Sequence, residues 1–288
     1  MKDRIDPLIA QRAPWLFRPG AMARVARHLL NGALSYDETL RTATRLQHAT
    51  SAEIMATMFD RLGGSVSARG LEHVPRQGAA LIVANHPTGI ADGIILHGLL
   101  ARIRPDTYFF ANKDILAVMP QMADMIAPVE WRREARSHGK TRETMRFLRQ
   151  AMDDERLGVI FPSGRLAQRR GLRLFERPWM TSAAGLARRY EVPVIPVNIR
   201  ARNSALFYFF DLLHPSLRDV TLFHETLNKA RQPFEVTVGE PISPHAIPAD
   251  AAEGTALLRR ATLALGADGA PSVSLVGATR RPVLRGWV

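Results

Sequence analysis

Hydrophobic and polar positions divide the chain into a helical first part and a longer second part built from short apolar runs. Residues 1–64 read as helical, and Ser35 and Glu38 have the spacing of a capping box ahead of a helix expected over residues 39–59. Two successive glycines then end the helical pattern. We therefore expect residues 1–64 to form an N-terminal helical segment.

Residues 65–265 alternate short apolar or β-branched runs with helical stretches. Strands are expected at residues 65–68, 80–84, 108–111, 127–131, 158–161, 192–199 and 234–238. Strands that alternate with helices indicate an α/β layer architecture rather than a helical bundle or a β-sandwich. We predict one α/β domain with a mostly parallel or mixed sheet of about seven strands, flanked by helices.

Two helices and a tail complete the predicted layout. Residues 141–152 carry apolar side chains at offsets of three and four, which predicts a helix that packs on the sheet. Small side chains across residues 181–190 predict a second helix that approaches the sheet closely. From residue 266 the chain turns to Gly, Ala, Ser and scattered Arg, so we expect residues 266–288 to form a flexible basic tail.

The composition is that of a folded globular protein, with 46% hydrophobic and 23% charged residues over 288 positions. Cysteine is absent, which excludes a disulfide framework, a thiolate metal site and a cysteine nucleophile. The first ten residues lack the pattern of a signal peptide, and no stretch reaches the roughly 18 apolar residues of a spanning helix. We expect a cytoplasmic chain that does not cross a bilayer.

The chain is strongly basic. Its formal charge is +12, and residues 131–177 hold thirteen Arg or Lys against six Asp or Glu, a net of +7. A field of that sign attracts nucleic acid, an anionic lipid surface or an acidic carrier protein. Charge alone does not choose among these partners.

The most informative stretch is residues 81–93, an apolar strand that runs into a polar turn containing His86 and Asp92. Proteins of the α/β class place their sites at strand ends. Because Pro87 follows, the imidazole is held in a turn, where the Asp92 carboxylate would fix its tautomer and raise the basicity of the other nitrogen. The plainer alternative is that Asn85, His86 and Asp92 only satisfy backbone groups at a turn and a helix start.

A second polar turn follows the strand expected at residues 158–161, and it carries Ser163 and Arg165. The planar fork of arginine matches phosphate, and four further arginines follow within twelve positions. The alternative for these arginines is a solvated surface. Ser163 does not fit a G-x-S-x-G nucleophile elbow, since Phe161 and Arg165 occupy the places of the glycines.

Metal and nucleotide chemistry have no support in the sequence. The histidines show no H-E-x-x-H or comparable ligand spacing, so we expect no metal site. Phosphate-binding loops of the G-x-x-x-x-G-K-[ST] or G-x-G-x-x-G type do not occur.

Taken together, residues 65–242 resemble the lysophospholipid and glycerol-phosphate acyltransferase superfamily, with four matching blocks in the same order. Asn85-His86 with Asp92 resembles the N-H-x-x-x-x-D block, and the stretch from Lys113 to Arg132 resembles the second block. Phe161-Pro-Ser-Gly-Arg165 resembles the F-P-E-G-T-R-S block, and residues 192–196 resemble the V-P-V-I-P-V block. One block would be a weak signal, whereas four in order indicate the family.

The resemblance implies an O-acyltransferase in which His86 is the general base and Asp92 orients it. The hydroxyl of a lysophospholipid, glycerol phosphate or related lyso-lipid would attack the thioester of acyl-CoA or acyl-carrier protein, with no further cofactor. It also implies an anionic membrane surface as a partner, at the inner face of the cell membrane. The substrate-binding residues that it implies are Asn85, Lys113, Arg132, Ser163, Gly164 and Arg165.

Two departures from the family pattern concern spacing and charge. Five residues separate His86 from Asp92 where the family has four, so the turn must bulge. Ser163 stands in the place of the usual glutamate, and Arg165 comes one position earlier than the family arginine. These changes leave room for a divergent acceptor, such as a lyso-aminolipid or another amphiphilic alcohol, beside lysophosphatidate and glycerol 3-phosphate.

Two rival functions follow from the same residues. A basic nucleic-acid-binding protein is suggested by the charge and by Trp131 and Phe175 lying among arginines. It would leave the histidine turn idle and has no recognised binding motif, so no nucleic acid is expected. The other rival is a non-catalytic lipid-binding member of the same fold.

Overall fold

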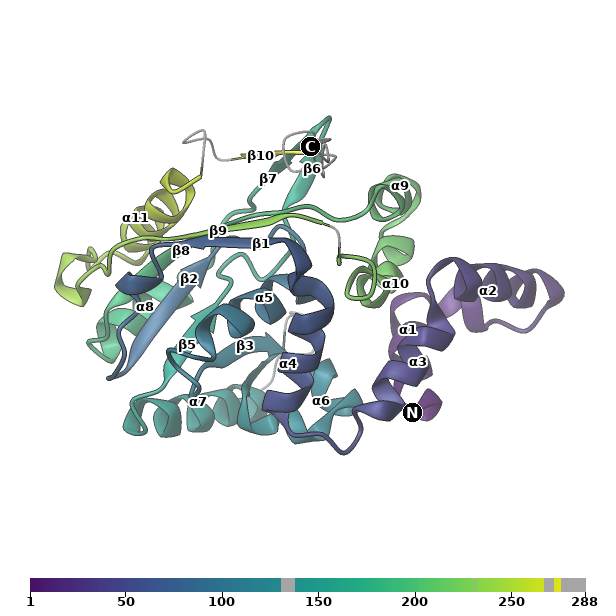
Figure 1. The fold of residues 1–288 in the computed structure, drawn as a ribbon, viewed down its shortest axis with the longest axis horizontal. Helices are drawn as coiled ribbons and strands as arrows, with labels where there is room; N and C mark the ends of the chain where they lie inside the picture. The colour runs from purple at the N-terminus through teal and green to yellow at the C-terminus, as the bar shows by residue number, and fades with distance from the viewer. Residues whose placement is uncertain (131–137, 231, 267–271, 276–288) are drawn as a thin grey trace, which may run out of the picture.

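The computed structural model describes residues 1–130, 138–230, 232–266 and 272–275, and its centre is a seven-stranded sheet (Figure 1). In spatial order the strands are β1 (Val66–Arg69), β9 (Phe234–Val238), β8 (Val194–Arg200), β2 (Ala80–Ala84), β5 (Leu157–Ile160), β3 (Tyr108–Asn112) and β4 (Ile126–Val129). Neighbouring strands are parallel except for β8 and β9. The predicted α/β fold with a mixed sheet of about seven strands is confirmed.

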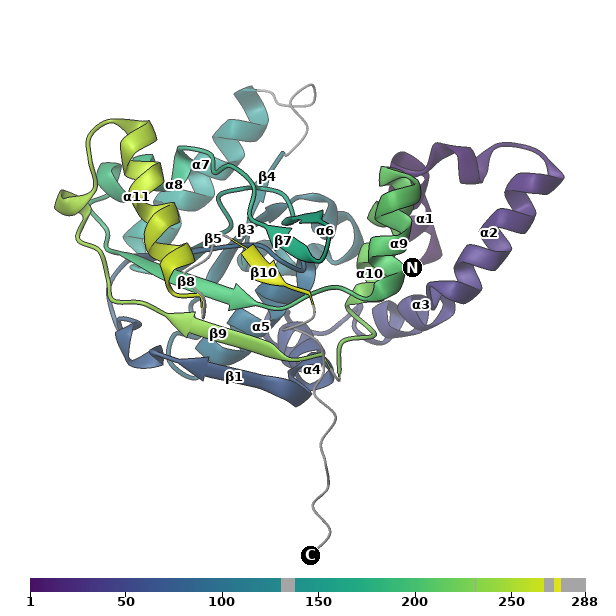
Figure 2. The same cartoon turned by 90° about the horizontal axis from the view of Figure 1, so that it is seen from above.

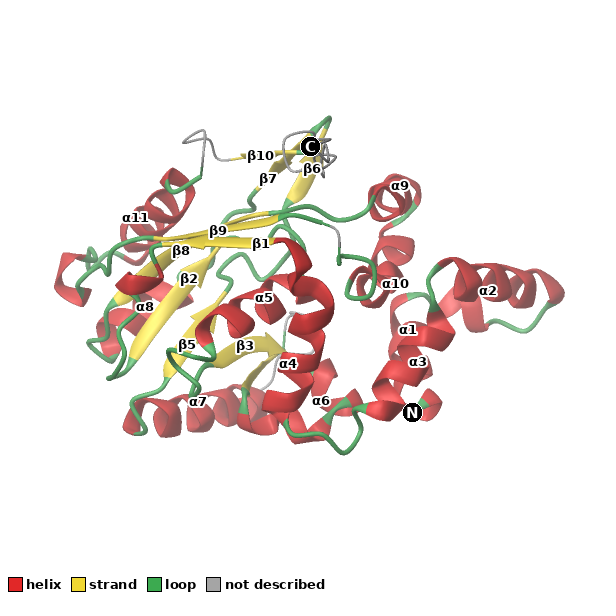
Figure 3. Cartoon of the chain, in the orientation of Figure 1, coloured by secondary structure: helices red, strands yellow, loops and turns green. Residues whose placement is uncertain are grey.

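Helices cover both faces of this sheet, as Figure 3 shows. Every residue of β2 is buried, because its alternate side chains point into two different cores. Ile82 packs in the core that contains residues of α4 (Ser51–Leu62) and α5 (Ile90–Leu100). Leu81 and Val83 pack in the core built with α7, α8 and α11. These helices span His138–Asp153 (α7), Ser182–Arg189 (α8) and Ala251–Ala264 (α11).

The N-terminal helices differ from the predicted single run. α3 (Tyr36–Arg45) and α4 are separate, so the helix expected over residues 39–59 is wrong. Ser35 adopts a left-handed φ of 52° and its side chain makes no cap hydrogen bond. The capping box lies instead at Thr50 and Glu53, where the Thr50 N–H donates to Glu53 Oε2 (2.8 Å) and the Glu53 N–H donates to Thr50 Oγ1 (3.3 Å).

The first three helices stand beside the sheet domain, next to α9 and α10 (Figures 1 and 2). These helices are α1 (Lys2–Arg12), α2 (Ala21–Ala33) and α3. By contrast, α4 packs on α5 as part of the core, although the expected domain boundary at residue 64 would place it with the helical segment. No helix in the described ranges is both long and apolar enough to span a membrane.

A small antiparallel sheet that was not predicted lies beyond β5. It consists of β6 (Gln168–Arg170), β7 (Arg173–Phe175) and β10 (Ser272–Ser274). β10 falls within the expected tail and is held by pairing with β7, while Leu275 is buried beside Leu174. Of the expected tail, residues 272–275 are thus described beside β7, and residues 267–271 and 276–288 lie outside the described part.

Two helices follow β8 and project from the sheet, α9 (Ala205–Leu213) and α10 (Pro215–Glu225). Their base is held by the buried ammonium of Lys229, which donates to Asn203 Oδ1 (2.6 Å) and to Glu225 Oε2 (2.7 Å). A buried charge is stable only when it is paired and hydrogen-bonded in this way. The shorter helical elements are α6 (Asp114–Val118) and the 3₁₀ turns Pro14–Phe17, Gly63–Ser65, Leu71–His73, Pro120–Asp124 and Pro244–Ala246.

Candidate active site

The polar residues expected to form the site gather at one edge of the sheet. β2, β3, β4, β5 and β8 are mutually parallel, so their carboxyl ends meet at the same edge. Asn85 and His86 directly follow β2, and Lys113 directly follows β3. Ser163, Gly164 and Arg165 follow β5, whereas Arg132 lies outside the described residues.

His86 and Asp92 are in contact despite the extra residue between them. Nδ1 of His86 lies 3.0 Å from Oδ2 of Asp92, and the carboxylate is fully buried. The two atoms make a close polar contact rather than a well-aligned hydrogen bond. With Nδ1 against the carboxylate, Nε2 is the nitrogen left to take a proton.

The extra residue is absorbed by the turn at Gly89, which has a φ of +88°. A Cβ at this position would also lie 3.2 Å from Leu166 Cδ2 and 3.5 Å from Leu222 Cδ2. Glycine therefore meets two requirements here, a backbone conformation that L side chains rarely adopt and close packing. The bulge that the spacing required is thus a glycine turn just before α5.

Asp92 and Asn85 also satisfy backbone groups, as the plainer alternative proposed. Asp92 Oδ2 accepts from the N–H groups of Thr88 (2.9 Å) and Gly89 (3.0 Å), which caps the start of α5. Asn85 donates to the Ile199 carbonyl (2.8 Å) and accepts from the Ile199 N–H (2.7 Å), which ties the turn to β8. The turn is therefore rigid, and Asp92 both caps the helix and reaches the imidazole.

His86 is held from the other side by the segment that follows β5. Its ring stacks on Phe161, with centroids 4.1 Å apart and an interplanar angle of 24°. Its carbonyl accepts from the Ala167 N–H (2.8 Å), and its N–H donates to Glu176 Oε2 (3.1 Å). Both the ring and the backbone of His86 therefore have fixed positions.

The second turn is shaped by Ser163 and Gly164 and exposes Arg165. The Ser163 hydroxyl donates to the Arg165 carbonyl (2.8 Å) rather than to the imidazole, so it is not arranged as a nucleophile. Gly164 has a φ of +58°, and a Cβ there would lie 2.9 Å from Met180 Cε. Arg177 donates to the Leu166 carbonyl (2.9 Å), and burial together with the nearby guanidinium of Arg165 lowers its pKa.

Nζ of Lys113 lies 3.7 Å from Oε2 of the buried Glu130, which directly follows β4. Among the described residues, no group of three or more His, Asp or Glu could hold a metal ion.

Glu176 is a buried residue that the sequence analysis did not single out. Its contact with His86 joins residues 90 positions apart, so no local sequence pattern predicts it. The only signal in the sequence is that Glu176 lies among arginines. Burial raises its pKa, while the donors around it favour its charged form.

Comparisons with known proteins point to one family. Residues 65–200 match the family model described as Acyltransferase. A lyso-glycine lipid O-acyltransferase of Phocaeicola vulgatus is 21% identical over 202 residues, covering 68% of this chain and 71% of that protein. One from Bacteroides thetaiotaomicron is 20% identical over 244 residues, covering 83% and 87%.

The fold is also similar to a solved structure. The crystal structure of the 1-acyl-sn-glycerophosphate (LPA) acyltransferase PlsC from Thermotoga maritima aligns with a TM-score of 0.50 at 12% identity, covering 84% of this chain and 95% of that chain. The family model, the relatives and the shared fold agree with the four sequence blocks. Residues 65–200 therefore form a domain that matches the Acyltransferase family, and the similarity to the two lyso-lipid acyltransferases extends over most of the chain.

Proposed function

We propose that the protein transfers a fatty-acyl group from acyl-CoA or acyl-carrier protein to the hydroxyl of a lyso-lipid, with His86 as the general base. The observation that carries the proposal is the contact of His86 with the buried Asp92 at the edge of the sheet. That contact orients the imidazole and leaves Nε2 for the acceptor.

In the proposed reaction, Nε2 of His86 removes the proton from the acceptor hydroxyl while its oxygen attacks the thioester carbonyl carbon. The carbon–sulfur bond then breaks, and the leaving thiolate takes the proton from the imidazolium. The products are an ester and a free thiol. Direct transfer needs no acyl-enzyme, consistent with the absence of cysteine and with the Ser163 hydroxyl facing the Arg165 carbonyl.

The acceptor is proposed to be a lyso-lipid with an anionic or zwitterionic head group. Arg165 is exposed at the tip of its turn, where its guanidinium is free to meet an anion. Arg132 is proposed to act with it, and Lys113 to lie at the rim of the site. The names of the two bacterial relatives add a lyso-glycine lipid to the candidate acceptors.

The protein is proposed to dock on an anionic membrane through α2 and α9. α2 has no buried residue, and its Met22, Val25 and Leu29 are exposed. α9 exposes Leu212 and Leu213 at its C-terminal end. Apolar side chains on helices of a basic protein match an interfacial site.

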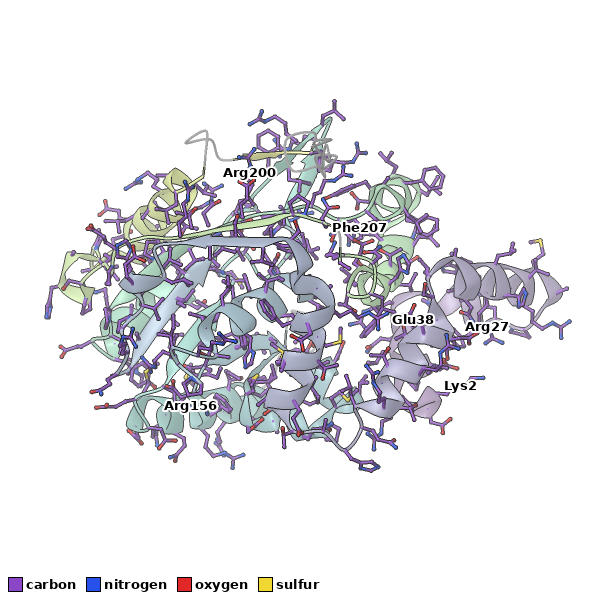
Figure 4. The ribbon with its side chains drawn as sticks, viewed as in Figure 1. Lys2, Arg27, Glu38, Arg156, Arg200 and Phe207 are labelled. Atoms are coloured by element: carbon purple, nitrogen blue, oxygen red, sulfur yellow. The ribbon has the colours of Figure 1, made fainter. Side chains whose placement is uncertain are left out.

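This docking surface lies close to the proposed site in the fold. α9 begins just after β8, at the same sheet edge as His86, because β8 and β2 are parallel. Figure 4 labels Arg200 at the end of β8 and Phe207, whose ring is buried at the base of α9. α2 lies at the same end of the molecule (Figures 1 and 2), and the labelled Arg27 stacks over Phe17 at 5.1 Å.

The experiment is mass spectrometry of lipids from cells with the gene, without it, and with the His86→Ala variant. We expect one lyso-lipid to accumulate and its acylated product to disappear both without the gene and with the variant. An unchanged lipid profile in cells that lack the gene would contradict the proposal. Full complementation by His86→Ala would contradict the role of the histidine.

A further inference from the structure

Glu176 places a second buried carboxylate against His86. Its side chain is 7% exposed and accepts from two donors, the His86 N–H at Oε2 (3.1 Å) and the Trp179 indole at Oε1 (2.9 Å). Its own carbonyl accepts from Arg259 of α11 (3.2 Å). Because both carboxylate oxygens are engaged, the side chain has a fixed position beside the turn.

The same carboxylate lies beside Ser163, which stands at the glutamate position of the F-P-E-G-T-R-S block. The Ser163 hydroxyl, which donates to the Arg165 carbonyl, also lies close enough to favour the charged form of Glu176. The carboxylate beside Ser163 thus comes from thirteen positions further along the chain.

We propose that Glu176 is the positioning residue for His86, and that it supplies from the loop after β7 the carboxylate that Ser163 lacks. It holds the His86 N–H while Ala167 holds the carbonyl, which fixes the histidine backbone at both ends. It acts on the reaction only through His86, so its loss should affect turnover rather than substrate binding. This role rests on the proposed acyl transfer.

The test is a swap of the two side chains. Glu176→Ser removes the carboxylate. The double variant, Ser163→Glu with Glu176→Ser, restores a carboxylate at position 163 and keeps the amino-acid composition of the wild type. Glu176→Gln is the milder variant, because one amide oxygen cannot accept from both the His86 N–H and the Trp179 indole. Exposed Glu253 on α11 provides a control, Glu253→Gln.

Two readouts separate this inference from the proposed function. Turnover of palmitoyl-CoA with lysophosphatidate as probe substrates gives kcat and both KM values. Hydrogen exchange of the His86 amide reports the contact without any activity. If the wild-type protein shows no turnover, the proposed function is in question and the exchange measurement alone decides this inference.

We expect Glu176→Ser to lower kcat roughly 10- to 100-fold, with both KM values within about twofold of wild type, as misplacement of a catalytic group does. Hydrogen exchange of the His86 amide should become faster in the same variant. The swap should regain at least about tenfold in kcat and restore protection. If Glu176→Ser does not fold, Glu176→Gln should show the same kcat loss in weaker form. Unchanged exchange and kcat, or a folded swap without recovery of either, would overturn the inference.

Discussion

Asp92 performs two tasks with one carboxylate, while the turn at Gly89 accommodates the longer spacing to His86. It caps α5 through the Thr88 and Gly89 N–H groups while Oδ2 also reaches the imidazole. The sequence predicted the pair because both residues lie in one short turn. It did not reveal Glu176, whose contact depends on how β6 and β7 fold back on the turn.

Replacing Asp92 by Asn tests the orienting role. An amide keeps one acceptor oxygen but loses the charge that favours the imidazolium, so we expect kcat to fall by roughly 10- to 100-fold, less than for loss of the histidine. The weakened cap should also lower the free energy of unfolding by about 1 kcal/mol in urea denaturation. An unchanged kcat would mean that another group orients His86.

Replacing Arg165 by Gln tests the acceptor site, and Arg132→Gln is expected to have the same effect. Removing a charge that contacts only the acceptor should raise the acceptor KM about tenfold and leave the donor KM unchanged. Arg189→Gln, on the exposed end of α8, is the control. Equal changes in the donor KM and the acceptor KM would mean that the anion-binding site lies elsewhere.

At the scale of elements, burial decides what the sequence could predict. The strands of the large sheet were recognisable because central strands such as β2 read as continuous apolar runs and edge-side strands such as β9 alternate apolar and polar residues. Both β2 and β9 match the predicted bounds. β6 and β7 are only three residues each and rich in arginine, so they carry no such signal. The break between α3 and α4 was missed because Ser35 and Glu38 imitate a cap that Thr50 and Glu53 make.

Binding to vesicles tests α2 and α9 as the docking elements. Removing exposed apolar side chains, by Leu212→Ser with Leu213→Ser or by Met22→Ser with Leu29→Ser, should weaken partition to anionic vesicles by roughly tenfold or more per pair. Binding should also fall as salt shortens the Debye length to about 8 Å or less, and neutral vesicles should bind poorly. Met145→Ser on α7 is the control, and equal effects of all three changes would exclude this surface.

For the whole molecule, the fold brings residues from separate blocks to one sheet edge and puts apolar helices at the same end. Parallel strands make the gathering of Asn85, His86, Lys113 and Arg165 predictable in outline. The packing of α1 on α6 was not predictable, because it depends on contacts far apart in sequence, such as Arg12 to Asp114 at 2.8 Å. The net charge of +12 indicated an anionic partner, and the fold suggests which end of the molecule would meet it, the end with α2 and α9.

The most direct test of the account is acyl transfer by the purified protein with and without the imidazole. With palmitoyl-CoA or acyl-carrier protein as donor and lysophosphatidate or a lyso-glycine lipid as acceptor, the wild-type protein should form the acylated lipid and release a free thiol. His86→Ala should lower kcat about 100- to 10,000-fold at an unchanged melting temperature, since general bases contribute that much. Activity of His86→Ala within a few-fold of wild type would contradict the account.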